Sequence, residues 1–157
     1  MKKILIAAAL AFSSVAFAKD VEVPQVYHEI AVTPATPREA EIASLFDRWN
    51  AALATGDADT VARLYAPDAV LEPTVSNQVR TSPAGIRDYF VKFLKMKPHG
   101  TVNFREIRWL GDGAALDTGV YTFDLTKNGL HQKVHARYTY VYRKVVSANL
   151  SAPRIGS

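Results

Sequence analysis

The sequence predicts an α+β domain in which a curved antiparallel sheet wraps around a long helix and leaves a pocket between them. Two amphipathic helical patterns come first, and a third covers about residues 82–97. A short apolar strand, Ala69–Pro73, separates the second helix from the third. Three long strand patterns then follow one another, as expected for an antiparallel meander. Because a sheet folded around a helix encloses a cavity, we expect this domain to act through what it holds there or by self-association.

The first helix is predicted to begin at Thr36-Pro37. Thr36 is a suitable N-cap, Pro37 suits the first helical position, and Glu39 follows three residues after the cap. Gly56 is the expected C-terminal stop. One apolar face with three-to-four spacing is formed by Ile42, Leu45, Phe46, Trp49, Ala52 and Leu53.

The next two helices carry similar start and stop signals. Asp57 or Asp59 can cap the second helix, and Pro67 ends it. Ser82-Pro83 opens the third, and Pro98 follows its end. Its buried face is predicted to consist of Ile86, Tyr89, Phe90, Phe93 and Leu94.

Three strand patterns complete the domain, over residues 102–110, 114–126 and 134–144. Gly111-Asp112-Gly113 and Asn128-Gly129 are turn signals that separate them. Neighbouring strands are therefore expected to pair as antiparallel hairpins.

The N-terminus carries the three parts of a secretory signal peptide: basic Lys2-Lys3, an apolar run over residues 4–11, and the cleavage pattern Ala16-Phe17-Ala18. The run is too short to span a bilayer, which needs about 20 residues. We therefore expect a signal peptide over 1–18, an extended leader over 19–37, and a periplasmic or secreted protein with no membrane association after cleavage.

Composition excludes several classes of function. The chain has no cysteine, so disulfides, thiol chemistry and iron–sulfur clusters are ruled out. Its basic residues are scattered, although the net charge is +4, and this argues against a nucleic-acid partner. The four histidines do not form a metal-ligand pattern, and no phosphate-binding or nucleotide fingerprint is present. We expect no metal and no cofactor.

Three segments carry a family resemblance: "LFDRWNAALATGDADTVARLYAPDAVLEP", "VRTSPAGIRDYFVKFL" and "LGDGAALDTGVYTF". Together they resemble the NTF2-like superfamily, most closely its SnoaL-like branch, which is related to the association (hub) domain of calcium/calmodulin-dependent kinase II. The resemblance covers most of the chain after the leader and implies an NTF2-like cone over residues 38–144. This fold hosts isomerases, dehydratases, binding proteins and oligomerisation hubs, so it does not by itself imply a function.

The C-terminus departs from that family. Its relatives end in a further strand that bears a Trp and a His-rich end and closes the pocket. Residues 145–157 read "VVSANLSAPRIGS", without alternation and without His. We therefore expect an irregular tail in place of the final strand, which leaves one sheet edge open. Either this branch has lost the strand, or the gene is truncated or frame-shifted.

Strand alternation predicts the polar residues of the pocket. Asp117 and Tyr121 share one face of their strand with Gly119 and Phe123, and Arg137 lies on one face of the next strand. If both faces line the cavity, Asp117 and Arg137 meet across it and orient a polar ligand. The alternative is a buried ion pair that only fixes the register. No catalytic residue is predicted, and the ligand-binding candidates are Trp49, Arg80, Tyr89, Asp117, Tyr121 and Arg137.

Other candidates have plain structural alternatives. Arg80 could reach the pocket mouth or be a solvated loop cation, and Trp49 and Tyr89 could serve both core and cavity wall.

Tyr138, Tyr140 and Tyr142 share the face opposite Arg137, which predicts an exposed aromatic row and self-association as a dimer or higher oligomer.

Three functions follow from these observations. The first is a non-catalytic periplasmic domain that binds a small polar or anionic molecule and assembles through its sheet. The second is a SnoaL-like enzyme of the isomerase or hydratase type that acts on a cyclic or polyketide-like substrate. In it, Asp117 would be the base, and Tyr121 with Arg137 would stabilise an enolate. The third is a pure oligomerisation module. We favour the first.

Overall fold

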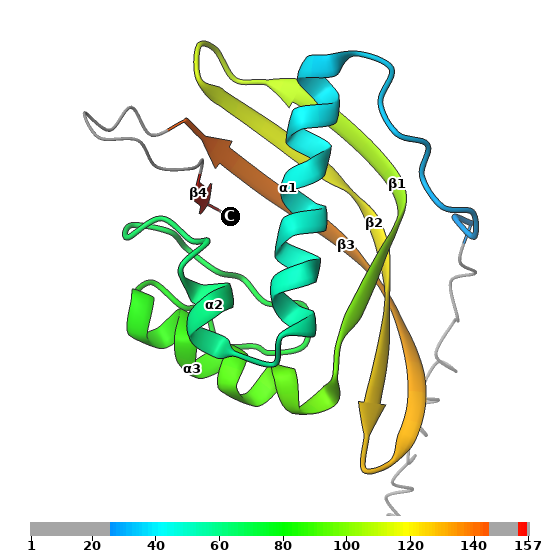
Figure 1. Cartoon of the computed structure of the whole chain (residues 1–157), viewed down its shortest axis with the longest axis vertical. Helices are drawn as coiled ribbons and strands as arrows, with labels where there is room; N and C mark the ends of the chain where they lie inside the picture. The colour runs from blue at the N-terminus through cyan, green and yellow to red at the C-terminus, as the bar shows by residue number, and fades with distance from the viewer. Residues whose placement is uncertain (1–25, 145–153, 157) are drawn as a thin grey trace, which may run out of the picture.

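The predicted architecture is confirmed in a computed structural model that describes residues 26–144 and 154–156. A long helix, α1, lies across the concave face of a strongly curved antiparallel sheet, and two shorter helices close one side (Figure 1). The sheet order is β1-β2-β3-β4. The elements are α1 (Pro37–Ala54), α2 (Ala58–Ala62), α3 (Pro83–Phe93), the 3-10 turn η1 (Leu94–Met96), β1 (His99–Trp109), β2 (Ala114–Lys127), β3 (Leu130–Arg143) and β4 (Arg154–Gly156).

Helix α1 begins as the sequence predicts. The backbone N–H of Glu39 donates to the Thr36 hydroxyl oxygen at 3.3 Å, and Pro37 occupies the first turn. Its apolar face packs into the core, where Phe46 and Leu53 are almost fully buried. The N-caps of α2 and α3 are Asp57 and Ser82, also as predicted. The helical residues that face the sheet are therefore the ones that the apolar period selects.

A β-bulge decides which side chains of β1 point inward. Pairing with β2 is regular up to Val102, which lies opposite Tyr121, and resumes with Phe104 opposite Val120, so Asn103 is the extra residue. The bulge brings the two backbones so close that a Cβ on Gly119 would lie 1.9 Å from the Phe104 carbonyl oxygen. Only glycine fits at position 119.

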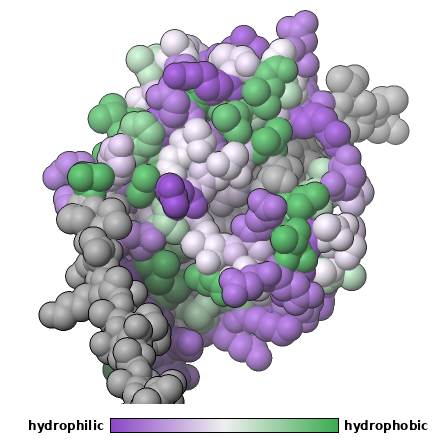
Figure 2. Space-filling model, turned by 180° about the vertical axis from the view of Figure 1, so that it is seen from behind, coloured by the Kyte–Doolittle hydropathy of each residue, from purple (hydrophilic) through white to green (hydrophobic). Residues whose placement is uncertain are grey.

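The predicted orientation of β3 is wrong. Counting back from the Asn128-Gly129 turn places Tyr140 opposite Asp117, and directly opposed residues of an antiparallel pair share a face. Tyr138, Tyr140 and Tyr142 therefore point inward and are each less than a tenth exposed, whereas Arg137 points outward. The exposed aromatic row does not exist. On the face seen from behind, hydrophobic side chains form small separate groups among hydrophilic ones (Figure 2).

The segment predicted as a short strand, Ala69–Pro73, contributes a single bridge, between Leu71 and Arg80. At the other end of the chain, Arg154–Gly156 pairs with Val141–Arg143 of β3, so part of the expected irregular tail forms a three-residue strand. Residues 145–153 lie outside the described part, as do the expected signal peptide and the first residues of the leader. Among the helices that the structure describes, none is both long and apolar enough to cross a bilayer.

Candidate ligand cavity

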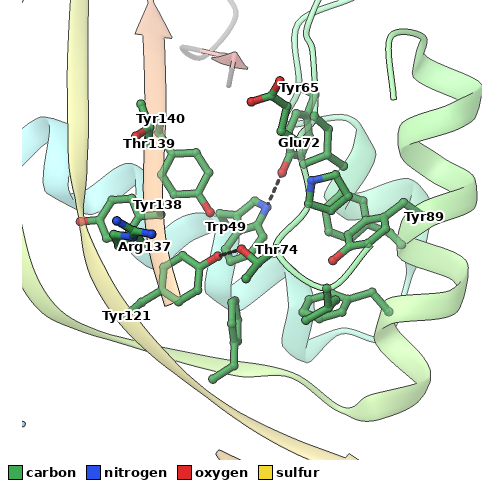
Figure 3. A pocket seen from close by; sticks show the side chains of 16 residues that line it. Trp49, Tyr65, Glu72, Thr74, Tyr89, Tyr121, Arg137, Tyr138, Thr139 and Tyr140 are labelled. Atoms are coloured by element: carbon green, nitrogen blue, oxygen red, sulfur yellow. Dashed lines mark hydrogen bonds between the residues drawn. The ribbon is translucent and has the colours of Figure 1, made fainter. Parts of the chain in front are cut away.

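A cavity of about 330 Å³ lies between the helices and the inner face of β2 and β3 (Figure 3). Helix α1 contributes Trp49, α3 contributes Tyr89, Phe90 and Phe93, and β2 contributes Tyr121 and Phe123. The rest of the lining is Tyr65, Leu71, Glu72, Pro73, Thr74 and Val75 from the α2–α3 connection, and Arg137, Tyr138, Thr139 and Tyr140 from β3. This volume is at the lower end of the range typical of small-molecule pockets.

Two side-chain hydrogen bonds hold the walls in place. The Trp49 indole N–H donates to the Tyr65 hydroxyl at 3.0 Å, and the hydroxyls of Thr74 and Tyr121 lie 2.6 Å apart (Figure 3). The second bond ties the loop over residues 71–75 to the sheet. Because each bond joins segments far apart in the sequence, it holds one wall of the cavity against another.

The tyrosines of the cavity remain neutral hydroxyls. Burial raises the pKa of Tyr65, Tyr89 and Tyr138, and it raises the pKa of Tyr140 well above its ordinary value. These groups therefore offer hydrogen bonds rather than charge. The charged residues in the lining are Glu72 and Arg137, both of which are exposed.

Four of the six predicted binding residues line the cavity: Trp49, Tyr89, Tyr121 and Arg137. Arg80 does not. Its backbone pairs with Leu71, its guanidinium donates to the Gln78 carbonyl at 2.5 Å, and its side chain is buried. The expectation that Arg80 reaches the pocket mouth is therefore wrong, and it is not a solvated loop cation either.

Asp117 also lies outside the lining, behind the aromatic wall. Its side chain is completely buried, and its partner is Arg105 of β1, not Arg137. The Arg105 Nε lies 3.2 Å from the carboxylate, and the Tyr138 hydroxyl donates to it at 3.0 Å. Burial raises the pKa of Asp117, and the arginine and the hydroxyl offset that rise only in part. The predicted pairing of Asp117 with Arg137 across the cavity is wrong.

Sequence reasoning missed Arg105 because the bulge at Asn103 reverses the alternation of β1. Unbroken alternation from Val102 would have turned Phe104 inward and Arg105 outward. One signal was present, since a glycine in the interior of a long strand, Gly119, often marks a bulge or a close backbone approach. In the described segments, no three His, Asp or Glu side chains form a group that could hold a metal ion.

The family model for the calcium/calmodulin dependent protein kinase II association domain matches residues 38–148. A solved structure from Xanthomonas campestris, described as a candidate domain of that same kind, is similar at 50% identity with a TM-score of 0.78. The match covers 84% of this chain and 92% of that one.

Two more distant structures share the fold. The hub homology domain of this kinase from Chlamydomonas reinhardtii is 20% identical over 76% of this chain and 93% of that one, with a TM-score of 0.57. An NTF2-like protein with a cystatin-like fold from Novosphingobium aromaticivorans is 12% identical over 73% and 75%, also with a TM-score of 0.57. The expected NTF2-like fold is thereby confirmed.

Proposed function

This chain belongs to the calcium/calmodulin dependent protein kinase II association domain family. We propose that it is a secreted, non-catalytic domain that binds a small molecule and self-associates, with secretion inferred from the signal-peptide pattern of residues 1–18. The observation that carries the binding function is the preformed aromatic cavity of about 330 Å³. Its walls are cross-linked by hydrogen bonds, and its polar lining consists of hydroxyls and two exposed charged side chains, Glu72 and Arg137.

The lining indicates the chemistry of the ligand. Rings of Trp49, Phe90 and Phe93 offer an apolar surface that favours a flat, apolar body. Neutral tyrosine hydroxyls supply hydrogen bonds, and of the two exposed charges in the lining, Glu72 and Arg137, the arginine is the one that could pair with an anionic group. A small polar-aromatic or anionic molecule fits this combination.

Self-association rests on the family and not on an exposed row of tyrosines. The matching family is an association domain, and a hub homology domain shares the fold. The outer face of the sheet is the surface we propose for assembly, since Leu116, Val120 and Val141 stand there half-buried among threonines. Light scattering at micromolar concentration should give a mass of two or more chains. A monomer would contradict this part of the proposal.

The residues assigned to catalysis in the enzyme alternative do not lie together in the cavity. Asp117, the base in that scheme, is sealed behind Tyr138 and held by Arg105, and Arg137 lies on the opposite face of the sheet from it. The scheme required Asp117, Tyr121 and Arg137 to converge on one substrate, and they do not.

Two measurements test the binding function. Native mass spectrometry of the purified protein should reveal a co-purified small molecule. The chain has two tryptophans, of which Trp49 lines the cavity and Trp109 lies outside it, stacked 3.6 Å below the Arg38 guanidinium. Titration with an anionic aromatic probe, anilinonaphthalene sulfonate, should therefore quench the emission of the Trp109→Phe variant, which retains Trp49.

The matched control is Trp49→Phe, whose remaining tryptophan reports from outside the cavity. Its emission should be quenched less in the same concentration range, because energy transfer to the bound probe weakens with distance and Trp109 lies outside the cavity. Equal responses from the two variants, or no response from either, would show that the cavity is not the binding site.

A further inference from the structure

The cavity has the shape of a gap between two chain edges. Its lining includes four consecutive residues of β3, Arg137–Tyr140, and five consecutive residues of the α2–α3 connection, Leu71–Val75. Successive side chains of an extended segment point to opposite faces. Because Arg137–Tyr140 lies within the extended strand β3, a cavity that contacts all four residues must run along the edge of that strand, beside its main chain.

On the β3 side, the main chain of alternate residues faces this gap. The Thr118 hydroxyl of β2 donates to the Tyr138 carbonyl at 2.8 Å, so the main chain of Tyr138 faces β2. In an antiparallel strand the N–H and C=O of one residue point to the same side, and its neighbours point to the other side. The N–H and C=O groups of Arg137 and Thr139 consequently face the gap, which explains how two residues with outward side chains line the cavity.

The α2–α3 connection closes the other side of the gap. Leu71 and Arg80 exchange two backbone hydrogen bonds, of 2.8 and 2.9 Å, so the main chain of Leu71 is already paired. The main-chain groups that this cavity offers to a ligand are therefore those on its β3 side.

The edge of β3 already accepts a strand at one end. β4 pairs with Val141–Arg143, directly beyond the residues that line the cavity. Among the described strands, none pairs with that edge between Leu130 and Tyr140. The cavity is continuous with this existing pairing along the same edge.

We propose that the cavity receives an extended peptide segment of another molecule, which adds to the sheet beside β3 at Arg137 and Thr139. This inference rests on the proposed binding function of the same cavity. An added strand would satisfy the main-chain groups that no described strand pairs with, as strand addition does at other open sheet edges. The peptide residue opposite Thr139 points its side chain to solvent, and its two neighbours point theirs inward, toward Trp49, Tyr65 and Phe90. The recognised sequence is therefore apolar–any–apolar.

Blocked tripeptides test this directly on the full chain. Acetyl-Leu-Ser-Leu-amide should bind, as measured by isothermal titration, and should slow amide hydrogen exchange at Arg137 and Thr139. Methylation of the serine nitrogen removes the central N–H and keeps every side chain. Because Thr139 C=O then lacks its partner, we expect affinity to fall at least about tenfold.

A pair of protein variants gives a second test. Thr139→Pro removes the N–H that faces the gap, whereas Thr139→Val keeps it, and both lose the same hydroxyl contact to Thr118. Only the proline variant should lose peptide binding, and urea unfolding followed by tryptophan fluorescence reports whether each variant is folded. If the proline variant fails to fold, the methylated peptide still decides the question.

The outcomes separate this inference from the proposed function. Binding of the sulfonate without binding of the peptide would overturn the inference and leave the small-molecule function in place. Equal affinity of the methylated and unmethylated peptides would likewise overturn it, because strand pairing requires the central N–H. Failure of both probes would overturn both proposals.

Discussion

The buried pair of Asp117 and Arg105 should be essential to stability, and Asp117→Ala tests this. Asp117 is fully buried, and the Arg105 side chain is only 10% exposed. Removing the carboxylate leaves the guanidinium without its counter-charge and the Tyr138 hydroxyl without its acceptor. Loss of one partner of a buried pair costs about 3–5 kcal/mol. Because Arg105 retains some access to solvent, we expect a value near the lower end.

The assay is urea unfolding followed by tryptophan fluorescence, at one fixed protein concentration because the protein is expected to self-associate. Asp124→Ala is the matched control on the same strand. Asp124 also pairs with a cation, Lys133 at 2.6 Å, but these side chains are 51% and 64% exposed. An exposed pair contributes at most about 1 kcal/mol.

A double change provides the complementary result. Asp117→Leu combined with Arg105→Met replaces the pair with apolar groups of similar size, so neither an unpaired charge nor a large void remains. The double variant should recover much of the stability that Asp117→Ala loses. If Asp117→Ala unfolds at the same urea concentration as Asp124→Ala, the buried pair does not contribute more to the free energy of unfolding than an exposed pair, and the reasoning is refuted.

Three further predictions concern pH, the bulge and the N-terminus. Burial raises the pKa of Asp117 in the folded state. The protonation of Asp117 therefore stabilises the fold fully below the unfolded-state pKa of about 4, and this stabilisation is lost as the pH rises through the folded-state pKa. The stability of Asp117→Asn relative to the parent should therefore increase with pH across that window, and a constant difference in urea midpoint would contradict it. Gly119→Ala should lower the free energy of unfolding by about 1–3 kcal/mol or more, since its Cβ would collide with the Phe104 carbonyl; unchanged urea unfolding would disprove the close approach. N-terminal sequencing of periplasmic material should begin at Lys19, and recovery of an uncleaved chain would rule out the signal peptide.

Much of the fold was predictable because it depends on local chemistry. The caps at Thr36 and Ser82 satisfy backbone groups of their own helices, so neighbouring residues are enough to place the helix starts. The inward set on β2, which includes Asp117 and Tyr121, follows from a single clear alternation. Trp49 and Tyr89 could be assigned to the cavity wall because the apolar face of a helix must point at the sheet.

The orientation of β3 was ambiguous from its own residues. Tyrosine has an apolar ring and a polar hydroxyl, so the row that begins at Tyr138 suits an inner face as well as an outer one. The two-residue turn at Asn128-Gly129 settles it, because it fixes Tyr140 opposite Asp117. This register was available in the sequence once the turn was used to count residues back along both strands.

Composition, segment order, helix caps and the faces of isolated elements were thus determined by the sequence itself, since each depends on residues close together in the chain. The partner of Asp117 and the edges of the cavity were decided by tertiary structure. A one-residue bulge at Asn103 turns Arg105 inward, and pairing of Leu71 with Arg80 withdraws that arginine from the cavity. Both outcomes depend on how distant strands meet, and a shift of one residue in a strand moves every following side chain to the other face.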